Sequence, residues 1–375
     1  MIFIESSGLL IIVEFLIRAR YRVNAVLCVS ARLYFLGITT TMSDASVIKK
    51  LSGYDLSGYS LMGSDLSGAK LAQAKLRGAN LAGADLSKAD LSEADLTGAD
   101  LSGADLYQAK LAGAKLNGAN LNHCDATSAN FLEATMTGTT LVSAKLPGTN
   151  FKKAQLSGAN FTECDLSDVD FSEAKISGAM FYRANLTNAN FNDSKLFGAK
   201  LQEANLSNAK FRNADLNSVR LRGAKLENAD LLKVSMFNAD LANASLLKSS
   251  FESANLRSIS MTGATLEKAV FDGADLSNSR LARANLSGAS LEESNLWSAR
   301  VSGTVFTKAN VKAANLMATG LSKKFALDEF PDLEFSKRTT WDDEFVKRHI
   351  VSRSHAEHIQ KEVSKKSFFS RLFSR

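Results

Sequence analysis

Aspartates that recur at intervals of twenty residues are the first side chains in the sequence whose spacing could support chemistry. The row consists of Asp65, Asp85, Asp105 and Asp125. If the fold stacks residues twenty apart, like charges in this line cost free energy unless water, a cation or a partner offsets them. Three interpretations remain open: a solvated surface on which each aspartate bonds to the backbone, a stripe that binds a partner protein, and a Ca²⁺ site.

Cysteine and histidine residues are too scattered in this chain to predict a metal site. Cys124 and Cys164 lie forty residues apart, and His123 stands alone. His355 and His358 are spaced as on one helix face, but a metal needs more ligands than this pair supplies. The glycines occupy turn positions and form no phosphate-binding loop. We therefore expect no enzymatic activity, no metal and no cofactor.

The C-terminal residues 361–375 combine apolar and basic side chains at helical spacing. Phe368 and Leu372 are four residues apart, as are Phe369 and Phe373, so a helix would present them on one face. Such a helix could contact an anionic membrane surface or a partner's groove. It could equally serve as a cap or as an oligomer contact.

A repeat of five residues must position the aspartates and cysteines. From Leu51 to Leu321 every fifth residue, here called position i, is Leu, Phe, Met, Ile or Val, with Ala126 as the exception. At position i−2, 48 of the 54 residues from Tyr54 to Thr319 are Ala, Ser, Thr or Cys, so a small residue accompanies nearly every large one. No insertion or deletion breaks this register.

Neither an α-helix nor a continuous strand can bury a period of five. In a helix, successive i residues would step by about 140° around the axis. In a strand they would alternate between faces, because five is odd. A chain that bends once per repeat does bury the pattern, since i−2 and i share one side of a short extended piece. We predict a hollow coil with i and i−2 inside and with i−1, i+1 and i+2 outside.

Glycine marks the bend, and phenylalanine gives the number of bends per coil. All 20 Gly from Gly53 to Gly303 stand at i+2, where a turn from i to i+3 needs a positive φ. Seven of the ten Phe at position i are separated by multiples of twenty residues: Phe131, Phe151, Phe171, Phe191, Phe211, Phe251 and Phe271. Twenty residues are four pentapeptides, so the predicted cross-section is a square. Its coils stack at about 4.8 Å.

Stacking at twenty residues sorts the outward charges into columns. Opposite signs alternate in two of them, Asp55, Lys75, Asp95, Lys115 and Lys70, Asp90, Lys110. An acidic belt is expected around one coil, from Glu163, Asp165, Asp168, Asp170 and Glu173. A basic column is expected from Lys200, Arg220, Arg280 and Arg300.

Two packing features follow from the pattern. Ala126 should leave a local void among the large residues, slightly relieved by Cys124 at the neighbouring small position. Solenoids also need caps over their apolar ends. Candidates are Val47 and Ile48 at the start and, outside the pentapeptide register, Phe325, Leu327, Phe330, Leu333, Phe335 and Trp341.

Composition divides the 375-residue chain into an apolar, basic segment (1–42), the repeat (43–321) and a charged cap and tail (322–375). Residues 51–320 contain 27 basic and 27 acidic residues, so the net charge of +6 lies outside the repeat and does not indicate direct nucleic-acid binding. The apolar runs before Met42 are too short to span a bilayer. We expect the native chain to begin at Met42, with a membrane anchor or targeting segment as the alternative.

The repeat resembles the pentapeptide repeat family, whose pattern reads A(D/N)LXX. Matching runs include Ala79-Asn80-Leu81-Ala82-Gly83 and Ala84-Asp85-Leu86-Ser87-Lys88. The resemblance, over about residues 49–321, implies an all-β solenoid: a right-handed quadrilateral β-helix with four repeats per coil. We expect a short, partly helical C-terminal tail to follow it. Family members act as topoisomerase-binding proteins, secreted effectors and developmental regulators, so the resemblance implies a fold more than a function.

From these observations we expect a non-catalytic, rigid scaffold that mediates protein–protein interaction in the cytoplasm. One alternative is a DNA-mimicking protein that binds a type II topoisomerase (gyrase), as in the quinolone-resistance branch of the family. Another is a secreted or membrane-associated effector. The expected partner is a protein, bound through the aspartate row or the tail. The C-terminal end could form a homodimer, and the tail could contact a membrane surface.

Overall fold

The computed structural model describes residues 51–319 and 339–341, which fall into two compact units. The described part of the first unit ends at Met180, and the second unit begins at Phe181. Within these residues there is no helix, and the β-structure consists of isolated bridges, one residue per pentapeptide. No helix of the described ranges could therefore cross a membrane. The tail predicted to be helical lies outside them.

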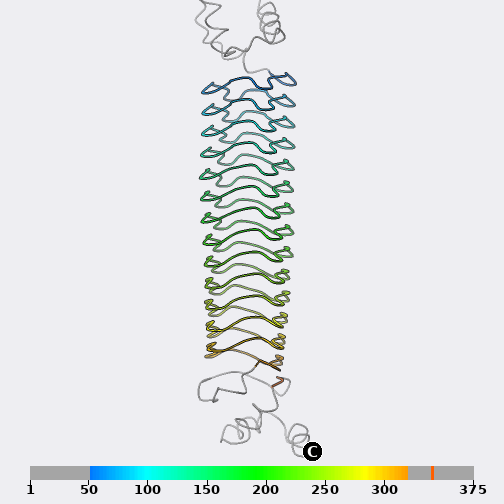
Figure 1. Cartoon of the computed structure of the whole chain (residues 1–375), viewed down its shortest axis with the longest axis vertical. Helices are drawn as coiled ribbons and strands as arrows, with labels where there is room; N and C mark the ends of the chain where they lie inside the picture. Colours follow the sequence, from blue (N-terminus) through cyan, green and yellow to red (C-terminus); the bar gives the residue numbers. More distant parts are fainter. Residues whose placement is uncertain (1–50, 320–338, 342–375) are drawn as a thin grey trace, which may run out of the picture. The chain divides into compact units, whose positions relative to one another are not determined.

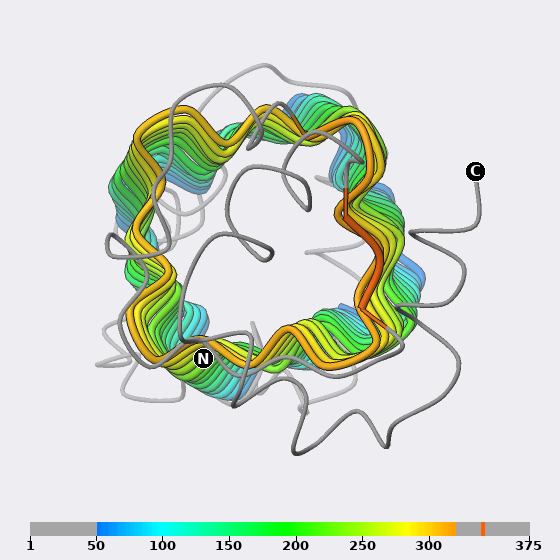
Figure 2. The same cartoon turned by 90° about the horizontal axis from the view of Figure 1, so that it is seen from below.

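Parallel bridges join residues twenty apart, so four pentapeptides close one coil. Asp85 bridges Asp105 in the first unit, and Arg280 bridges Arg300 in the second. Seen end-on, each coil has four sides, and the coils of each unit repeat the same outline (Figures 1 and 2). The predicted quadrilateral β-helix is confirmed in both units.

Every backbone N–H of a regular repeat finds an acceptor. Two point to the next coil, one to the previous coil, one closes the turn, and the fifth, at i+1, donates to the side chain at i−1. For residues 81–85 the bonds are Leu81 N to Asp100 O (2.6 Å), Ala82 N to Asn80 Oδ1 (3.0 Å), Gly83 N to Ser102 O (2.8 Å), Ala84 N to Leu81 O (3.0 Å) and Asp85 N to Ser64 O (3.0 Å). Asp and Asn recur at i−1 because they complete this set.

The turn has the predicted span, and its third residue has a positive φ whether or not it is glycine. Gly83 has φ 64°, and Lys88, at the same position of the next repeat, has φ 57°. For a residue with a Cβ this left-handed conformation costs roughly 1–2 kcal/mol. Lys88 N donates to Tyr107 O at 2.7 Å, so the bond to the next coil offsets part of the cost.

The interior of each unit is filled by the large residue at i and the small residue at i−2. Nearly all are fully buried, and only the first coil is looser, with Tyr54 and Tyr59 half-buried. The predicted phenylalanine ladder is present. Phe131 and Phe151 stack at 4.9 Å between ring centroids in the first unit, and Phe191 and Phe211 at 4.8 Å in the second. Ring stacking at nearly the coil spacing shows that the ladder repeats with the backbone.

Hydroxyl groups at the small position usually donate to a backbone carbonyl. Ser249 Oγ donates to Leu246 O at 2.7 Å, and Thr139 Oγ1 donates to Leu116 O at 2.8 Å. Ser279 Oγ differs: it is buried and has no hydrogen-bond partner among the described residues. The core therefore tolerates a hydroxyl mainly where a carbonyl oxygen can accept a hydrogen bond from it.

Residues 339–341 add one short edge to the last coil. Thr340 bridges Asn315, its N–H donates to Ala314 O, and its carbonyl accepts from Leu316 N, each bond measuring 2.9 Å. The offset from Asn315 is 25 residues, one pentapeptide more than in every other bridge. Thr339 is buried, as residues at i−2 are, whereas Trp341, at the place of i, is only half-buried. The predicted cap residue Trp341 therefore directly follows a residue bridged to the last coil, at the place of position i and not outside the register. The other predicted cap residues lie outside the described ranges.

Candidate interaction surface

Stacking brings the four predicted aspartates into one column of the first unit, named here the acidic stripe. Parallel bridges link Asp65 to Asp85, Asp85 to Asp105, and Asp105 to Asp125. Each of them occupies position i−1, the middle of one wall, on four successive coils. At about 4.8 Å per coil the stripe extends about 14 Å.

Each carboxylate of the stripe holds the turn that follows it. Asp85 Oδ1 accepts from Ser87 N at 2.9 Å, and Asp105 Oδ1 accepts from Tyr107 N at 2.8 Å. Asp65 and Asp125 accept the equivalent bonds from Ser67 and Thr127. The backbone bond expected of each aspartate is present. The bond also fixes the direction of each carboxylate, so the stripe is ordered before any partner arrives.

A lysine ends the run of like charges. Lys145 follows Asp125 in the column, and its Nζ lies 3.9 Å from Asp125 Oδ2. Lys145 is largely in solvent and Asp125 partly so, and the two charged atoms are far apart for an ion pair, so this pair contributes little. Because the positive charge of Lys145 adjoins Asp125, the negative potential of the stripe is strongest at Asp65, Asp85 and Asp105, on the three preceding coils.

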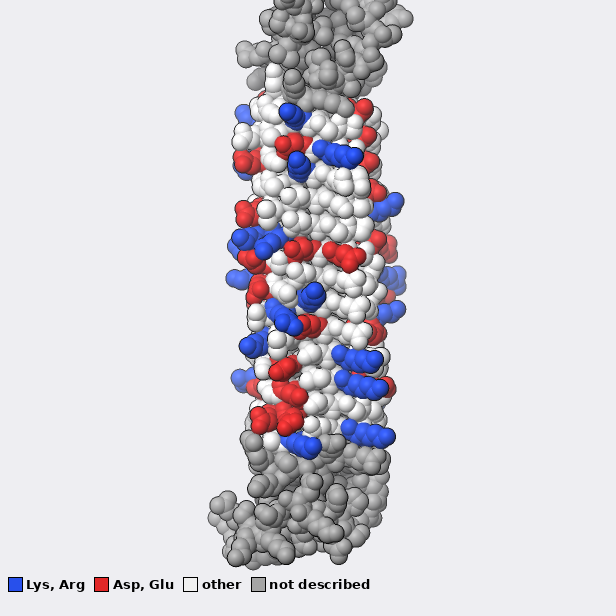
Figure 3. Space-filling model, turned by 180° about the vertical axis from the view of Figure 1, so that it is seen from behind, with Lys and Arg blue, Asp and Glu red and all other residues white. Residues whose placement is uncertain are grey.

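The adjoining columns alternate in sign, as predicted. Lys70, Asp90 and Lys110 are joined by bridges in that order. The hydroxyl of Ser92, with its N–H and with Lys110 and Lys70, holds the pKa of Asp90 below its ordinary value, although partial burial opposes this shift. Charges of both signs intermingle on the face drawn in Figure 3. Such columns neutralise themselves and offer a partner little net charge.

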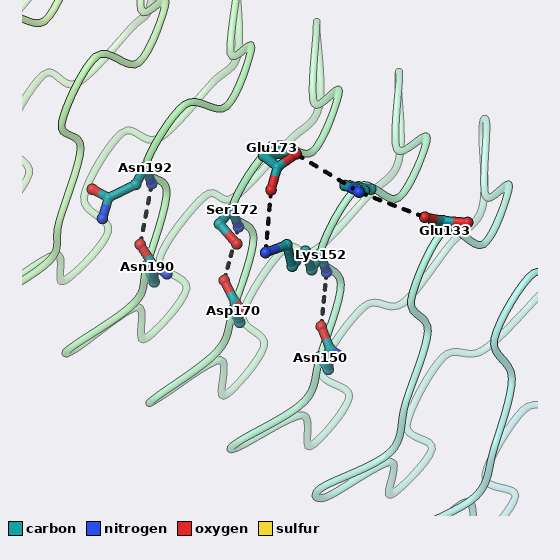
Figure 4. A network of polar contacts seen from close by, with 9 residues as sticks. Glu133, Asn150, Lys152, Asp170, Ser172, Glu173, Asn190 and Asn192 are labelled. Carbon is teal, nitrogen blue, oxygen red and sulfur yellow. Dashed lines mark hydrogen bonds and ion pairs between the residues drawn. The ribbon is translucent and has the colours of Figure 1, made fainter.

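The acidic belt predicted around one coil is partly neutralised by lysines of the preceding coil. Lys152 Nζ lies 3.1 Å from Glu173 Oε1, and Lys153 lies between Glu133 (3.8 Å) and Glu173 (4.0 Å), as Figure 4 shows. Asp170 accepts from Ser172 N at 2.9 Å, as each aspartate of the stripe accepts from its own turn, so the difference between the two surfaces lies in these lysines. The acidic stripe therefore remains the stronger candidate surface.

Within the described ranges, the residues with nucleophilic or metal-binding side chains do not converge. Cys124 and Cys164 are buried free thiols. Burial raises the pKa of Cys164 to about 12 and raises that of Cys124 as well, so both remain protonated near neutrality. In the described ranges no group of three His, Cys, Asp or Glu residues could hold a metal. The tail residues Phe368, Phe369, Leu372 and Phe373 lie outside these ranges.

One surface feature was missed from the sequence. Phe197, Phe237, Trp297 and Met317 all stand at position i+1, at intervals that are multiples of twenty, and all are exposed. They form one column along a corner of the second unit, named here the apolar edge. The sequence does contain the signal: these outward apolar residues lie a multiple of twenty residues apart, and such residues share one column.

Comparison with known proteins gives the family. The sequence model described as "Pentapeptide repeats" matches residues 64–231 and 235–322. No curated protein matches the chain. One similar solved structure is HetL, a pentapeptide repeat protein involved in heterocyst differentiation regulation in the cyanobacterium Nostoc sp. strain PCC 7120. It is 27% identical over 72% of this chain and 97% of HetL, with a TM-score of 0.24.

Two further solved structures are similar. QnrB1, a plasmid-mediated fluoroquinolone resistance protein, is 16% identical over 53% of this chain and 91% of its own, with a TM-score of 0.35. A pentapeptide repeat protein of the Arabidopsis thaliana thylakoid lumen is 38% identical over 32% of this chain and 69% of its own, with a TM-score of 0.19. From the family match and the coil geometry together, this chain is a member of the pentapeptide repeat family, with the right-handed quadrilateral β-helix of that family.

Proposed function

We propose that this chain is a non-catalytic, rigid scaffold that binds a protein partner along its outward columns. The observation that carries the proposal is the acidic stripe. In it, four carboxylates on successive coils each accept a hydrogen bond from the turn that follows, which fixes their direction. Because the carboxylates are ordered already, a basic partner would meet them without a further entropic cost for fixing their side chains. Regular spacing would favour a partner whose cations repeat along one line.

The test uses the fact that asparagine occupies the same position elsewhere in the chain. Asn80 Oδ1 accepts from Ala82 N just as the aspartates accept from their turns. Replacing all four stripe aspartates by Asn therefore removes four charges and keeps the turn bonds. A matched control replaces Asp55, Asp90, Asp95 and Asp100, which lie outside the stripe, in the same way. Affinity capture with the full chain should recover a partner with the wild type and the control but not with the stripe variant. Equal recovery by the two variants would remove the stripe from the proposal.

A second candidate function is a DNA mimic that occupies the DNA site of a type II topoisomerase. The ordered row of carboxylates favours it, because such a row can take the place of backbone phosphates. A gyrase supercoiling assay separates this candidate from a general scaffold. Inhibition by the wild type that the stripe variant loses would support the mimic, and no effect at micromolar protein would exclude it.

The remaining expectations belong to the same proposal. They are a cytoplasmic location, contact of the tail with an anionic membrane, and a homodimer formed through the C-terminal end. Cell fractionation, co-sedimentation with anionic vesicles and light scattering test them in turn. In the vesicle experiment, a variant in which Ser replaces Phe368, Phe369, Leu372 and Phe373 should no longer sediment with the vesicles if the tail makes the contact.

A further inference from the structure

The apolar edge concentrates exposed apolar surface where the rest of its unit has little. Among the described residues of the second unit, five large apolar side chains are exposed: Phe197, Phe237, Trp297, Val305 and Met317. Four of these five share a single column. Phe197 is 57% exposed, and the other three members of the edge are each 46% exposed. Large apolar side chains aligned in this way mark an interaction site more often than scattered ones do.

A basic column lies on the wall next to the apolar edge. Each coil carries its i−1 residue three positions after the edge residue, so Trp297 is followed by Arg300 and Phe197 by Lys200. The bridges that run from Lys200 to Arg220 and from Arg280 to Arg300 place these cations in one column, with Asp240 and Ser260 between the two pairs. All four cations are exposed, and none forms an ion pair within the described ranges.

On the other flank of the edge the charges are mixed. That wall carries Lys195, Asp215 and Asp275 in one column, and Arg257, which stands in the edge itself, lies 3.8 Å from Asp275. The surplus positive charge is therefore confined to one side of the apolar edge. A complementary partner must present apolar side chains along one line and carboxylates beside them.

The backbone decides the conformation of the partner. Along the walls the N–H and C=O groups are already bonded between coils, so the side of the solenoid offers no free edge to an added strand. An α-helix needs no such edge, because its own backbone bonds are satisfied. From Phe197 to Met317 the edge spans six coil steps, about 29 Å at the β spacing, which a helix of roughly 19 residues covers.

We propose that the apolar edge and its basic column form a docking site for an acidic amphipathic α-helix of a partner protein. The proposal rests on the scaffold function above but uses a different surface from the acidic stripe. The chain's own residues 361–375 do not suit the site, because their lysines and arginines repeat the sign of the basic column. Single-stranded nucleic acid suits it less well, since Asp215, Asp240 and Asp275 would face its phosphates and the aromatic residues are two or three coils apart.

The probe for this site is a synthetic peptide of roughly 20 residues, with Leu and Phe along one helix face and Glu elsewhere, labelled for fluorescence anisotropy. Full-length protein should bind it, and replacing Phe237 and Trp297 by Ser should weaken binding at least about tenfold. Replacing Arg280 and Arg300 by Gln should weaken binding and flatten its dependence on salt. Because all four side chains are exposed, circular dichroism should show the same fold in every variant.

Matched controls separate this site from general stickiness. Replacing Met62 and Tyr107, exposed residues of the first unit, by Ser should leave the affinity unchanged. A peptide of the same composition with its apolar residues scattered should not bind. The proposal is overturned if the wild type fails to bind the helix peptide, if the scattered peptide binds equally, or if an oligonucleotide binds the same residues more tightly. The stripe variant should still bind the peptide, so failure here is distinguishable from failure of the proposed function.

Discussion

Asp105 Oδ1 accepts a hydrogen bond from the backbone N–H of Tyr107 at 2.8 Å, two residues along the chain. The carboxylate that makes the acidic stripe negative is thus also the acceptor that completes the turn. Where i−1 is neither Asp nor Asn, the N–H at i+1 can donate instead to a side chain of the preceding coil. Phe237 N, for example, donates to Asn217 Oδ1 at 2.8 Å. Charge and fold can therefore be separated by substitution at position 105.

Replacing Asp105 by Ala should destabilise the protein, whereas replacing it by Asn should not. Alanine leaves the Tyr107 N–H to solvent, a loss of about 0.5–1.5 kcal/mol, and asparagine keeps an acceptor in place. Thermal unfolding followed by circular dichroism measures the difference, and amide exchange at Tyr107 should be faster only in the Ala variant. Identical exchange in the two variants would contradict the role assigned to the turn bond.

Ser279 and Ser249 should respond in opposite directions to replacement by Ala. Ser279 Oγ is buried without a partner among the described residues, so its removal relieves a cost of about 1–3 kcal/mol. Ser249 Oγ donates to Leu246 O, so its removal loses a bond. The melting temperature should rise for Ser279→Ala and fall for Ser249→Ala. A fall in both would mean that the Ser279 hydroxyl has an acceptor after all.

Replacing Ala126 by Leu should stabilise the coil that contains it. Position i holds a larger residue in every other repeat, and Ala126 is fully buried among them. Leucine would add buried apolar area worth about 1.5–3 kcal/mol where the wild type has a methyl group. The contrasting change, Leu166→Lys, places a charge in the core and should unfold several coils. A lower melting temperature for Ala126→Leu would count against the proposed packing.

Asp90 should contribute to the dependence of stability on pH. Its folded pKa lies below the ordinary 3.8, so the stabilisation is present above that value and is lost as the pH falls through the folded pKa. The difference in melting temperature between wild type and Asp90→Asn should therefore be larger at pH 6 than at pH 3. Replacing both Lys110 and Lys70 by Gln should reduce this difference in melting temperature at pH 6. A difference independent of pH would exclude this contribution.

The buried thiols should be unreactive in the folded protein. Burial raises the pKa of Cys164 to about 12, and that of Cys124 is raised too, so at pH 8 almost no thiolate is present. The third cysteine of the chain, Cys28, is first replaced by Ser so that it does not contribute to the signal. In this variant neither Cys124 nor Cys164 should react with a disulfide reagent until denaturant is added, and both should then react. Reaction of either under native conditions would show that the coil opens locally.

The repeat, the turn and the phenylalanine ladder could all be predicted from the sequence alone, because each depends only on the spacing of residues. Leu81 and Gly83 repeat with a fixed period, and Phe131 and Phe151 lie one coil apart, so no long-range contact had to be guessed. The same arithmetic placed Asp65 above Asp85. It did not predict the bridge between Asn315 and Thr340, which lie 25 residues apart instead of 20.

What spacing could not give are properties of individual atoms. That Lys88 takes a left-handed conformation follows from the backbone of its neighbours and not from its own preference. Ser279 Oγ has no hydrogen-bond partner in the described part of the chain, whereas Ser249 Oγ donates to Leu246 O, and both stand at i−2, so spacing does not distinguish them. The neutralisation of Glu173 by Lys152 and Lys153 depends on how long side chains lie across two coils.

The closure of one coil by twenty residues also limits how a gene for this protein can grow. Duplicating a segment of four pentapeptides lengthens the solenoid and returns every downstream residue to its own wall. Duplicating a single pentapeptide after Thr97 would shift Asp105 and Asp125 by a quarter turn and leave Asp65 and Asp85 where they are. Recombination in units of sixty nucleotides therefore preserves surface patterns, whereas units of fifteen rearrange them while the large and small residues still point inward.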